Sequence, residues 1–443
     1  MSGTRITRRA MMAGTAAALA LPQMTGCTRG RGKRLEIAVP WSGGELDRFR
    51  EVLDGYRPAA VDVTSAGNDI DAFLRARHRA GNSPDIALLS RPGLLPGYVD
   101  EGWLEEIPET PEVIDRFPGA WRRLLEVDGT MYGIWIKGAH KSLFWQTEAS
   151  PLDEPASWGD LVDQVSDAAD AARRHGGPAP LAIGAADGWV LTDWLENLLV
   201  SRTDGTVYDA LARGDACWDE SEVFSSFGDL FDLWSVPGAF PGGPGRALLT
   251  QYEESILQVF AAGTASAVFE GDFVAQVIKR FARKGEPEPQ HFRFPSALGG
   301  RHRRPLLVGG DAAVLMSATD EARRLLDWLA EADSFESWID DGGFLTPNQD
   351  IEYSDDVQQA LADELVDEAN DPRFDLSDLL AGPLGGGDGQ GSWRILQDFF
   401  VAATEPGARR HDVVTTVTER LNDAARRTTG TTGTRGIDPD ACR

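Results

Sequence analysis

Short apolar segments that alternate with helical patterns open the folded part of the sequence. The apolar segments are LEIAV at 35–39, VDVTSA at 61–66 and DIALLS at 85–90, and apolar spacing typical of helices lies between them, at 45–56 and 70–80. Short strands that alternate with helices form a parallel sheet with helices wound on both sides. The sequence therefore predicts an α/β fold.

The carboxyl ends of these strands lead into loops that are candidates for a ligand site. In doubly wound sheets the ligand crevice lies beyond the carboxyl ends of the strands. In this sequence that rule selects the loops at 41–44, 66–68 and 90–93.

Strand and helix patterns continue through the middle of the chain. Asp128 and Gly129 predict a hairpin turn between two strand-like runs. The run ASAVF at 265–269 predicts a strand that turns at 270–272 into a helix beginning near Phe273. Further strands are expected at 141–146 and 181–185, and further helices at 160–175 and 248–260.

Composition and charge narrow the class of protein. With 42% apolar and 26% charged residues, a chain of 443 residues can bury more than one core, so two domains are expected. The formal net charge of −27 makes nucleic acid an unfavourable partner. Cys217 and Cys442 could pair or stay free, and no bridge is predicted because Cys442 lies in a Thr/Gly-rich tail, 429–443, expected to be disordered.

The first 26 residues read as a targeting segment rather than as part of the fold. They hold the adjacent Arg8 and Arg9, an apolar stretch too short to span a bilayer, and small residues before Cys27. This segment resembles a twin-arginine signal followed by a lipobox, in which Cys27 is acylated; the alternative is an ordinary signal peptide with an incidental cysteine. Residues 27–34 would then form a basic tether, and the protein would be lipid-anchored at the outer face of the cytoplasmic membrane.

The order of segments along the body resembles the extracellular solute-binding proteins of ABC importers, in particular the carbohydrate-binding family 1. Five stretches carry the resemblance, and it runs from about residue 35 to 422. They are PDIALLSRPGLLPGYVDEGWLEEI at 84–107, DGTMYGIWIKGAHKSLFWQ at 128–146, PASWGDLVDQV at 155–165, AAGTASAVFEGDFVAQVI at 261–278 and GGDAAVLMSATDEARRLLDWLAEADSFESWIDDGGFLTPNQ at 309–349.

The resemblance implies a two-lobed, periplasmic-binding-protein-like fold of type II. Each lobe would be a doubly wound sheet flanked by helices, with a hinge between the lobes. Lobe one would comprise 35–137 and 306–350, and lobe two 138–305 and 351–428. The family further implies a monomer that needs no cofactor, catalyses no reaction, captures a small carbohydrate and delivers it to ABC permease subunits in the membrane.

Sugars present hydroxyl rims and C–H faces, so their sites need flat aromatic platforms and a few placed polar groups. The family's platforms map onto Trp189, Phe273 and Trp393, while Trp41 and Trp135 also fall where the resemblance places loops. Core packing is the expected role of Trp103, Trp158, Trp328 and Trp338, whose spacing is that of helices or turns. Polar contacts are expected from Ser42, Asn68, Ser90, Arg91, Asp187, Asp272, Gly309, Gly310 and Asp311.

Lys137 and His140 leave the charge of the ligand open. Either residue, if it reached the cleft, would allow an acidic or phosphorylated sugar; the alternative is that one of them is a solvated loop residue.

Two other classes of function remain beside a carbohydrate receptor. One is a secreted carbohydrate-active hydrolase, and the other is a binding protein for a non-sugar solute. Paired carboxylates could carry out the chemistry of a hydrolase. Asp340 and Asp341, however, are adjacent in the sequence, so their side chains point to different faces, and the same holds for Asp355 and Asp356. The sequence contains no G-x-S-x-G or H-E-x-x-H motif and no zinc spacing among its six His and three Cys. An adhesion protein would show repeats, and none is visible.

Overall fold

The structure is a computed structural model that describes residues 34–428, except 109, 111–114, 203–204, 282–288, 300–303, 381 and 387–390. The expected signal segment, Cys27, nearly all of the tether and the C-terminal tail lie outside the described residues. Within the part that is described, no helix combines the length and the apolar character needed to cross a membrane.

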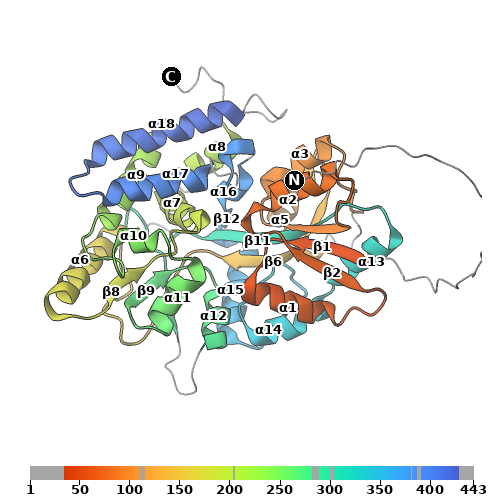
Figure 1. The fold of residues 1–443 in the computed structure, drawn as a ribbon, viewed down its shortest axis with the longest axis horizontal. Coiled ribbons are helices and arrows are strands. Elements are labelled where there is room, and N and C mark those ends of the chain that lie inside the picture. Colours follow the sequence, from red (N-terminus) through yellow and green to blue (C-terminus); the bar gives the residue numbers. More distant parts are fainter. Residues whose placement is uncertain are drawn as a thin grey trace, which may run out of the picture.

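The first sheet is built on the strands that open the body of the sequence (Figure 1). β1 (Leu35–Val39) pairs in parallel with both β2 (Val61–Ser65) and β3 (Ile86–Leu89), and α1 (Gly43–Leu53) and α2 (Ile70–Arg79) connect them. This confirms the predicted α/β pattern. The sheet has six strands in the order β12-β11-β3-β1-β2, and β6 also pairs with β11; the added strands are β6 (Gly133–His140), β11 (Leu307–Leu315) and β12 (Arg373–Phe374).

The second sheet forms the other half of the molecule (Figure 1). Its order is β10-β7-β9-β8, with β8 and β9 parallel and the other pairs antiparallel. The strands predicted at 141–146, 181–185 and 265–269 are confirmed with small shifts of their ends. The strands are β7 (Leu143–Gln146), β8 (Ala179–Ala182), β9 (Ala265–Phe269) and β10 (Gln290–Arg293), and the helices packed around them include α6 (Trp158–His175), α7 (Gly188–Arg202), α9 (Ser221–Trp234), α11 (Tyr252–Phe260), α12 (Val274–Phe281), α17 (Ser392–Thr404) and α18 (Arg410–Thr428).

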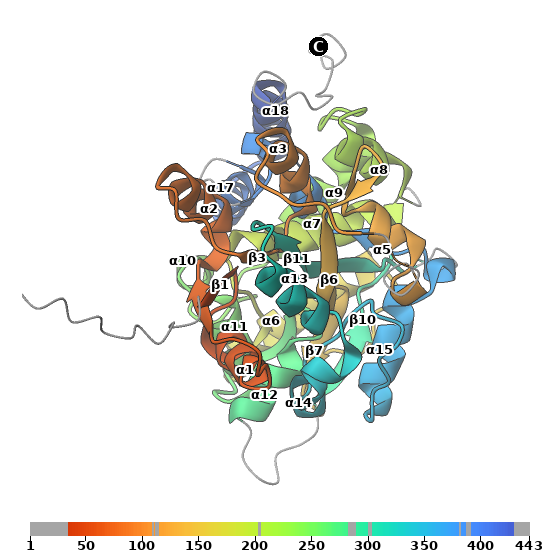
Figure 2. The same cartoon turned by 90° about the vertical axis from the view of Figure 1, so that its right-hand side faces the viewer.

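Two long antiparallel strands connect the halves. β6 and β11 pair from Val314 opposite Gly133 to Val308 opposite His140, with a shift in register after Asp311. Figures 1 and 2 both place the two strands side by side, and Figure 1 shows them between the two groups of helices. Together with the separate sheets, these crossing strands give the two-lobed architecture that was expected.

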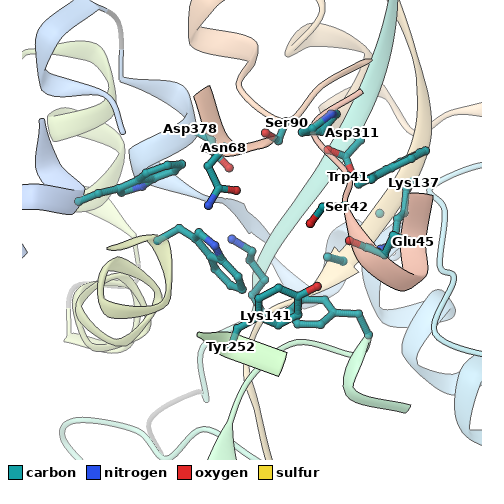
Figure 3. A pocket seen from close by; sticks show the side chains of 17 residues that line it. Trp41, Ser42, Glu45, Asn68, Ser90, Lys137, Lys141, Tyr252, Asp311 and Asp378 are labelled. Atoms are coloured by element: carbon teal, nitrogen blue, oxygen red, sulfur yellow. The ribbon is translucent and has the colours of Figure 1, made fainter. Parts of the chain in front are cut away.

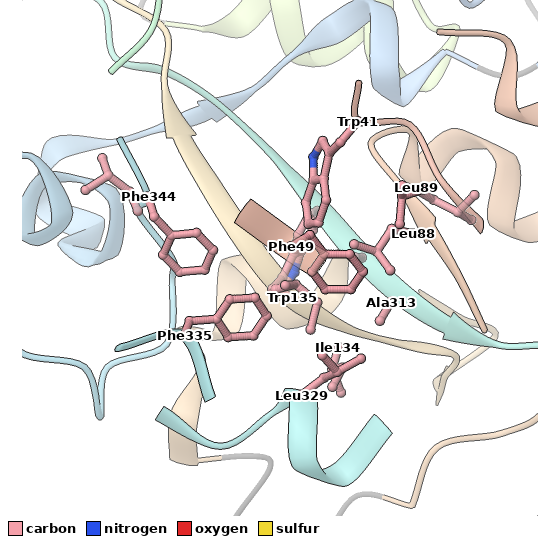
Figure 4. Packing of buried hydrophobic residues seen from close by; sticks show 14 of the residues in the cluster. Trp41, Phe49, Leu88, Leu89, Ile134, Trp135, Ala313, Leu329, Phe335 and Phe344 are labelled. Atoms are coloured by element: carbon pink, nitrogen blue, oxygen red, sulfur yellow. The ribbon is translucent and has the colours of Figure 1, made fainter. Parts of the chain in front are cut away.

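Aromatic packing in the first lobe fixes the start of the loop after β1 (Figure 4). The Trp41 ring lies edge-on to Phe49 at 5.0 Å and to Trp338 at 5.3 Å, measured between ring centroids. Such pairs contribute about 0.5–1.5 kcal/mol each beyond the burial of their surface. The contacts with Phe49 and Trp338 therefore fix the orientation of the Trp41 indole. Trp135 also lies in this core, within β6 and 2% exposed, so its expected place in a loop is wrong.

Several smaller expectations can be compared with the structure. The hairpin is confirmed: Asp128 and Gly129 both have positive φ, at 51° and 80°, between β4 (Glu126–Val127) and β5 (Thr130–Met131). Cys217 is disulfide-bonded, contrary to the expectation of no bridge, while Cys27 and Cys442 lie outside the described residues. Trp103, Trp158 and Trp338 are buried, and Trp328 packs at the edge of the first core, as expected.

The remaining elements are η1 (Gly67–Asp69), η2 (Pro92–Leu94), α3 (Leu95–Asp100), α5 (Gly119–Arg123), β4 (Glu126–Val127), β5 (Thr130–Met131), α8 (Thr206–Arg213), α10 (Pro244–Ala247), α13 (Asp320–Leu329), η3 (Ala332–Phe335), α14 (Glu336–Asp341), α15 (Asp356–Val366), η4 (Glu368–Asn370), α16 (Leu376–Leu379) and η5 (Gly382–Leu384).

Candidate functional site

A pocket of about 160 Å³ lies where the two lobes face each other across β6 and β11 (Figure 3). The loops after β1, β2 and β3 form one side of it, as the rule for parallel sheets predicts. The starts of α7, α11, α12, α16 and α17 approach from the other lobe. The lining residues are Pro40, Trp41, Ser42, Glu45, Asn68, Ser90, Lys137, Gly138, Ala139, Lys141, Trp189, Tyr252, Phe273, Gly310, Asp311, Asp378 and Trp393.

Most of the residues singled out from the sequence meet in this pocket. Those that line it are Trp41, Ser42, Asn68, Ser90, Lys137, Trp189, Phe273, Gly310, Asp311 and Trp393. Four others lie behind the lining: Arg91, Asp187, Asp272 and Gly309.

The four residues behind the lining support its walls. Asp187 accepts hydrogen bonds from the Tyr252 backbone N–H at 2.9 Å and from the Asn68 amide at 3.4 Å, so it links the lobes beside the pocket. Asp272 accepts from the His140 backbone N–H at 2.8 Å.

Arg91 and Gly309 complete the supporting set. The Arg91 side chain is 5% exposed and packs against Gly385, where an added Cβ would lie 1.9 Å from its Nη2. Gly309 faces Lys141, where an added Cβ would come within 3.0 Å of the lysine Cε. Their place in the structure is thus close packing beside the pocket.

Three aromatic side chains from separate elements make up one wall. Centroid distances are 5.5 Å between Trp189 and Tyr252, 5.9 Å between Trp189 and Phe273, and 5.7 Å between Tyr252 and Phe273. Tyr252 was not anticipated, because its position reads as one more apolar site of a helix. Trp393 also lines the pocket, and its Nε1 donates to the Ser377 hydroxyl at 3.1 Å. The wall therefore offers apolar ring faces whose orientation is fixed by contact with one another.

Lys137 lies beside Phe273, with its Nζ 5.8 Å from the centre of that ring, and is surrounded by carboxylates. Its ammonium forms an ion pair with Glu45, and Asp311 lies opposite it across β6 and β11. Burial lowers the pKa of Lys137, but Glu45, Asp311 and Asp272 outweigh burial and leave the pKa above its ordinary value. The ammonium therefore stays charged. Glu45 was missed because a glutamate in a first helical turn is usually a solvated residue.

Lys141 anchors the base of the aromatic wall. Its Nζ lies 3.1 Å from Asp193, 2.5 Å from Asp375 and 5.3 Å from the centre of the Trp189 ring. Burial raises the pKa of Asp193 well above its ordinary value, whereas Lys141 and Ser377 overcome burial and lower the pKa of Asp375. Asp375 is therefore the ionised partner. Sequence reasoning found neither Lys141 nor its partners Asp193 and Asp375, because the three residues are far apart in the chain.

Two further carboxyl groups face the pocket. Asp311 accepts from the Trp41 indole N–H at 2.8 Å, and burial raises its pKa to about 6. The Asp378 carboxyl accepts no hydrogen bond from any other described residue, and burial followed by the nearby Asp375 raises its pKa well above the ordinary value. Asp378 was not predicted as a site residue from the sequence. Both groups leave oxygen atoms available to a ligand with hydroxyl groups.

His140 has a structural role. It is fully buried, its Nε2 lies 2.9 Å from Glu364, and it does not line the pocket. It is therefore neither a cleft residue nor a solvated loop residue.

Residues 58–363 match the family described as bacterial extracellular solute-binding protein. The chain belongs to this family. The osmoprotective compounds-binding protein GgtB of Synechocystis sp. is 28% identical over 386 residues, which is 84% of this chain and 89% of that protein. The alpha-glucosides-binding periplasmic protein AglE of Rhizobium meliloti is 24% identical over 394 residues, covering 83% of this chain and 84% of AglE.

Solved solute-binding proteins share the fold. RafE of Streptococcus pneumoniae, solved in complex with raffinose, aligns with a TM-score of 0.70 at 14% identity, covering 89% of this solute-binding chain and 100% of RafE. The family is one of binding proteins rather than enzymes. Among the described residues, no cluster of three or more His, Cys, Asp or Glu could hold a metal ion.

Proposed function

We propose that this solute-binding protein captures a small carbohydrate in the interlobe pocket and delivers it to the permease of an ABC importer. The observation that carries this proposal is the juxtaposition in one pocket of an aromatic wall, made by Trp189, Tyr252 and Phe273, and of polar groups with free hydrogen-bonding capacity. The names of AglE and of the RafE complex, which refer to alpha-glucosides and raffinose, support the same class of ligand.

The chemistry of the pocket suits a ring of carbon atoms that carries hydroxyl groups. The C–H faces of a sugar can lie against the aromatic wall, and its hydroxyls can donate to Asp311 and Asp378. The Ser42 and Ser90 hydroxyls take part in no hydrogen bond with the rest of the described chain, so they can donate to or accept from the same rim. A micromolar affinity needs only about −8 kcal/mol, which a few such contacts can supply.

Closure of the lobes over the ligand would provide the signal to the permease. The proposed lobes are 35–137 with 306–350, and 138–305 with 351–428. Two sets of contacts link them near the pocket. Asn68 donates to Asp187 at 3.4 Å, and Lys279 donates to the Asp340 carbonyl at 3.1 Å and lies 3.7 Å from Asp341. These contacts form only when the lobes are close, so they would stabilise the closed state.

We further propose export through the twin-arginine signal and a lipid anchor at Cys27, with the monomer held at the outer face of the cytoplasmic membrane. The supporting features are Arg8 and Arg9, the short apolar stretch and the small residues before Cys27. Cys27→Ser should release the protein into the medium of an expressing culture. Continued retention in the membrane fraction would contradict the anchor.

Isothermal titration against a panel of mono- and oligosaccharides, run beside a hydrolysis assay, tests the ligand class. The proposal expects one sugar bound per chain and recovered intact. Cleavage of a glycan without its retention would favour a secreted hydrolase. Tight binding of a non-sugar solute such as an amino acid, with no response to any sugar, would favour the other alternative.

A further inference from the structure

The turn between β9 and α12 carries one ring of the aromatic wall and ties it to the strands that connect the lobes. Asp272 exchanges two hydrogen bonds with His140 at the end of β6. The Asp272 backbone N–H donates to the His140 carbonyl at 3.1 Å, and the Asp272 carboxyl group accepts from the His140 backbone N–H at 2.8 Å. Phe273 comes next and lies over Gly271, where an added Cβ would be 2.4 Å from the ring. The position of the Phe273 ring therefore depends on the path of the backbone on both sides of it.

The helix that continues from Phe273 lies against the first of the two proposed lobes. Figures 1 and 2 both place α12 beside α1 and α14, two helices of that lobe. Val274 and Val277 are the buried residues of α12, and both belong to the hydrophobic cluster of the first lobe. The same cluster contains Trp338 and Phe344. A helix of the second lobe therefore shares the core of the first.

A glycine permits the closest approach between α12 and the first lobe. Gly343 follows α14 and has a φ of 71°. A Cβ built on Gly343 would lie 2.5 Å from the Cβ of Gln276, 3.0 Å from its backbone nitrogen and 3.3 Å from its Cα. Carbon atoms in contact are separated by about 3.5–4.0 Å, so any side chain at 343 would push the two backbones apart. Rotation of the Gln276 side chain gives no relief, because its Cβ and backbone atoms make the contact.

Two other contacts between α12 and the first lobe are more tolerant of change. Lys279 donates to the Asp340 carbonyl at 3.1 Å through a long side chain. An added Cβ on Gly44 would lie 2.9 Å from the Nη1 of Arg280, which is the far end of a flexible side chain. Either contact can adjust by side-chain movement. The contact of Gly343 cannot, so it fixes how closely α12 approaches the first lobe.

We infer that Gly343 is a positioning residue of the binding site, which lets α12 pack on the first lobe and thereby holds the Phe273 ring in the aromatic wall. This inference rests on the proposed carbohydrate function and adds to that site a residue that is not part of its described lining. Gln276 lies less than one helical turn after Phe273, so a displacement of Gln276 also moves the ring. A gap of about 0.5–1 Å between packed groups already forfeits about a quarter to a half of their dispersion attraction.

Gly343→Ala tests the inference, and Gly342→Ala is its matched control. Both glycines have positive φ, at 71° and 84°, so both substitutions strain the backbone. A Cβ on Gly342 would lie 3.5 Å from the Nε2 of Gln358, which is an ordinary contact, and would not meet α12. The assay is isothermal titration of the full chain with glucose, galactose, maltose and raffinose, with circular dichroism to confirm folding. For the sugar that the wild type binds most tightly, we expect about tenfold weaker binding by Gly343→Ala and a change of less than about twofold in Gly342→Ala.

A second substitution in the Gly343→Ala variant separates positioning from a general loss of stability. Gln276→Gly removes the Cβ that the new methyl group meets first and leaves the backbone nitrogen at 3.0 Å, a distance that a small shift relieves. Because glycine within a helix is destabilising, the double variant should unfold at a lower urea concentration than Gly343→Ala. We nevertheless expect it to bind sugar about threefold more tightly than Gly343→Ala. Loss of affinity in step with loss of stability would refute the positioning role.

The remaining outcomes distinguish this inference from the proposed function. A folded Gly343→Ala variant that binds sugar within about twofold of the wild type would overturn the inference alone. If Gly343→Ala does not fold, Lys279→Ala removes another contact of α12 with the first lobe. That variant should bind about threefold more weakly, and an unchanged affinity would overturn the inference. Failure of the wild type to bind any sugar of the panel would overturn the proposed carbohydrate function and this inference with it.

Discussion

Removing the charge of Lys141 should destabilise the protein more than any surface charge change. The Lys141 ammonium is buried against Asp375, and Asp375 is in turn the N-cap of α16, accepting hydrogen bonds from the Ser377 hydroxyl at 2.7 Å and from the Asp378 N–H at 3.2 Å. In Lys141→Met the Asp375 charge would remain buried without a partner. Breaking a buried pair in this way costs about 3–5 kcal/mol of folding free energy.

The assay is urea-induced unfolding followed by tryptophan fluorescence. Arg213→Met is the matched control, because Arg213 and Asp215 form a pair with both side chains more than 60% exposed, and its loss should cost less than about 1 kcal/mol. The double variant Lys141→Met with Asp375→Asn should recover much of the loss, since no charge is then left unpaired. A cost below about 1 kcal/mol for Lys141→Met alone would refute the electrostatic account of this cluster.

Three further predictions follow from the same structure. Trp189→Ala should weaken sugar binding about tenfold or more in isothermal titration, while Trp189→Phe keeps a ring and should lose less; undiminished binding by the alanine variant would remove the proposed platform. Tyr208→Phe should cost about 1–3 kcal/mol in urea unfolding, because the Tyr208 hydroxyl lies 2.6 Å from the buried Phe374 carbonyl and 3.0 Å from Glu196; a change within 0.5 kcal/mol would count against that network. Burial raises the pKa of Asp272 to about 6 in the native state. Between about pH 4 and pH 6 the Asp272 carboxyl is therefore protonated in the native state and ionised in the unfolded state, so the free energy of unfolding should fall as the pH rises through that window. Asp272→Asn should remove up to about 3 kcal/mol of that fall, measured by urea unfolding at pH 4, 5, 6 and 7.5, and identical pH profiles would contradict the assignment.

The strands and helices were predictable because their signals are local. The runs at 35–39 and 265–269 consist of residues that suit buried strands, and the Asp128-Gly129 turn needs the positive φ angles that the structure shows. The loops at the carboxyl ends of the first three strands followed from topology alone, and Trp41, Asn68 and Ser90 lie in or beside the pocket for that reason.

The charged part of the site could not be predicted in the same way. Lys141 pairs with residues 52 and 234 positions away, and no local pattern reports contacts at such separations. Asp378 lies within the short helix α16 and Tyr252 begins α11. In such positions an acidic residue normally has a solvated role and an aromatic residue a packing role. Trp135 was misplaced because an aromatic residue between glycine-containing turns can equally belong to a strand interior, and its indole N–H is satisfied there by the Trp121 carbonyl at 2.8 Å.

A crystal structure of the protein grown with its tightest-binding sugar would test the central claim most directly. The account predicts one intact sugar between the lobes, with a ring face against Trp189 or Trp393 and hydroxyl groups within hydrogen-bond distance of Asp378 and Asp311. A sugar bound outside this pocket, or found cleaved within it, would contradict the account.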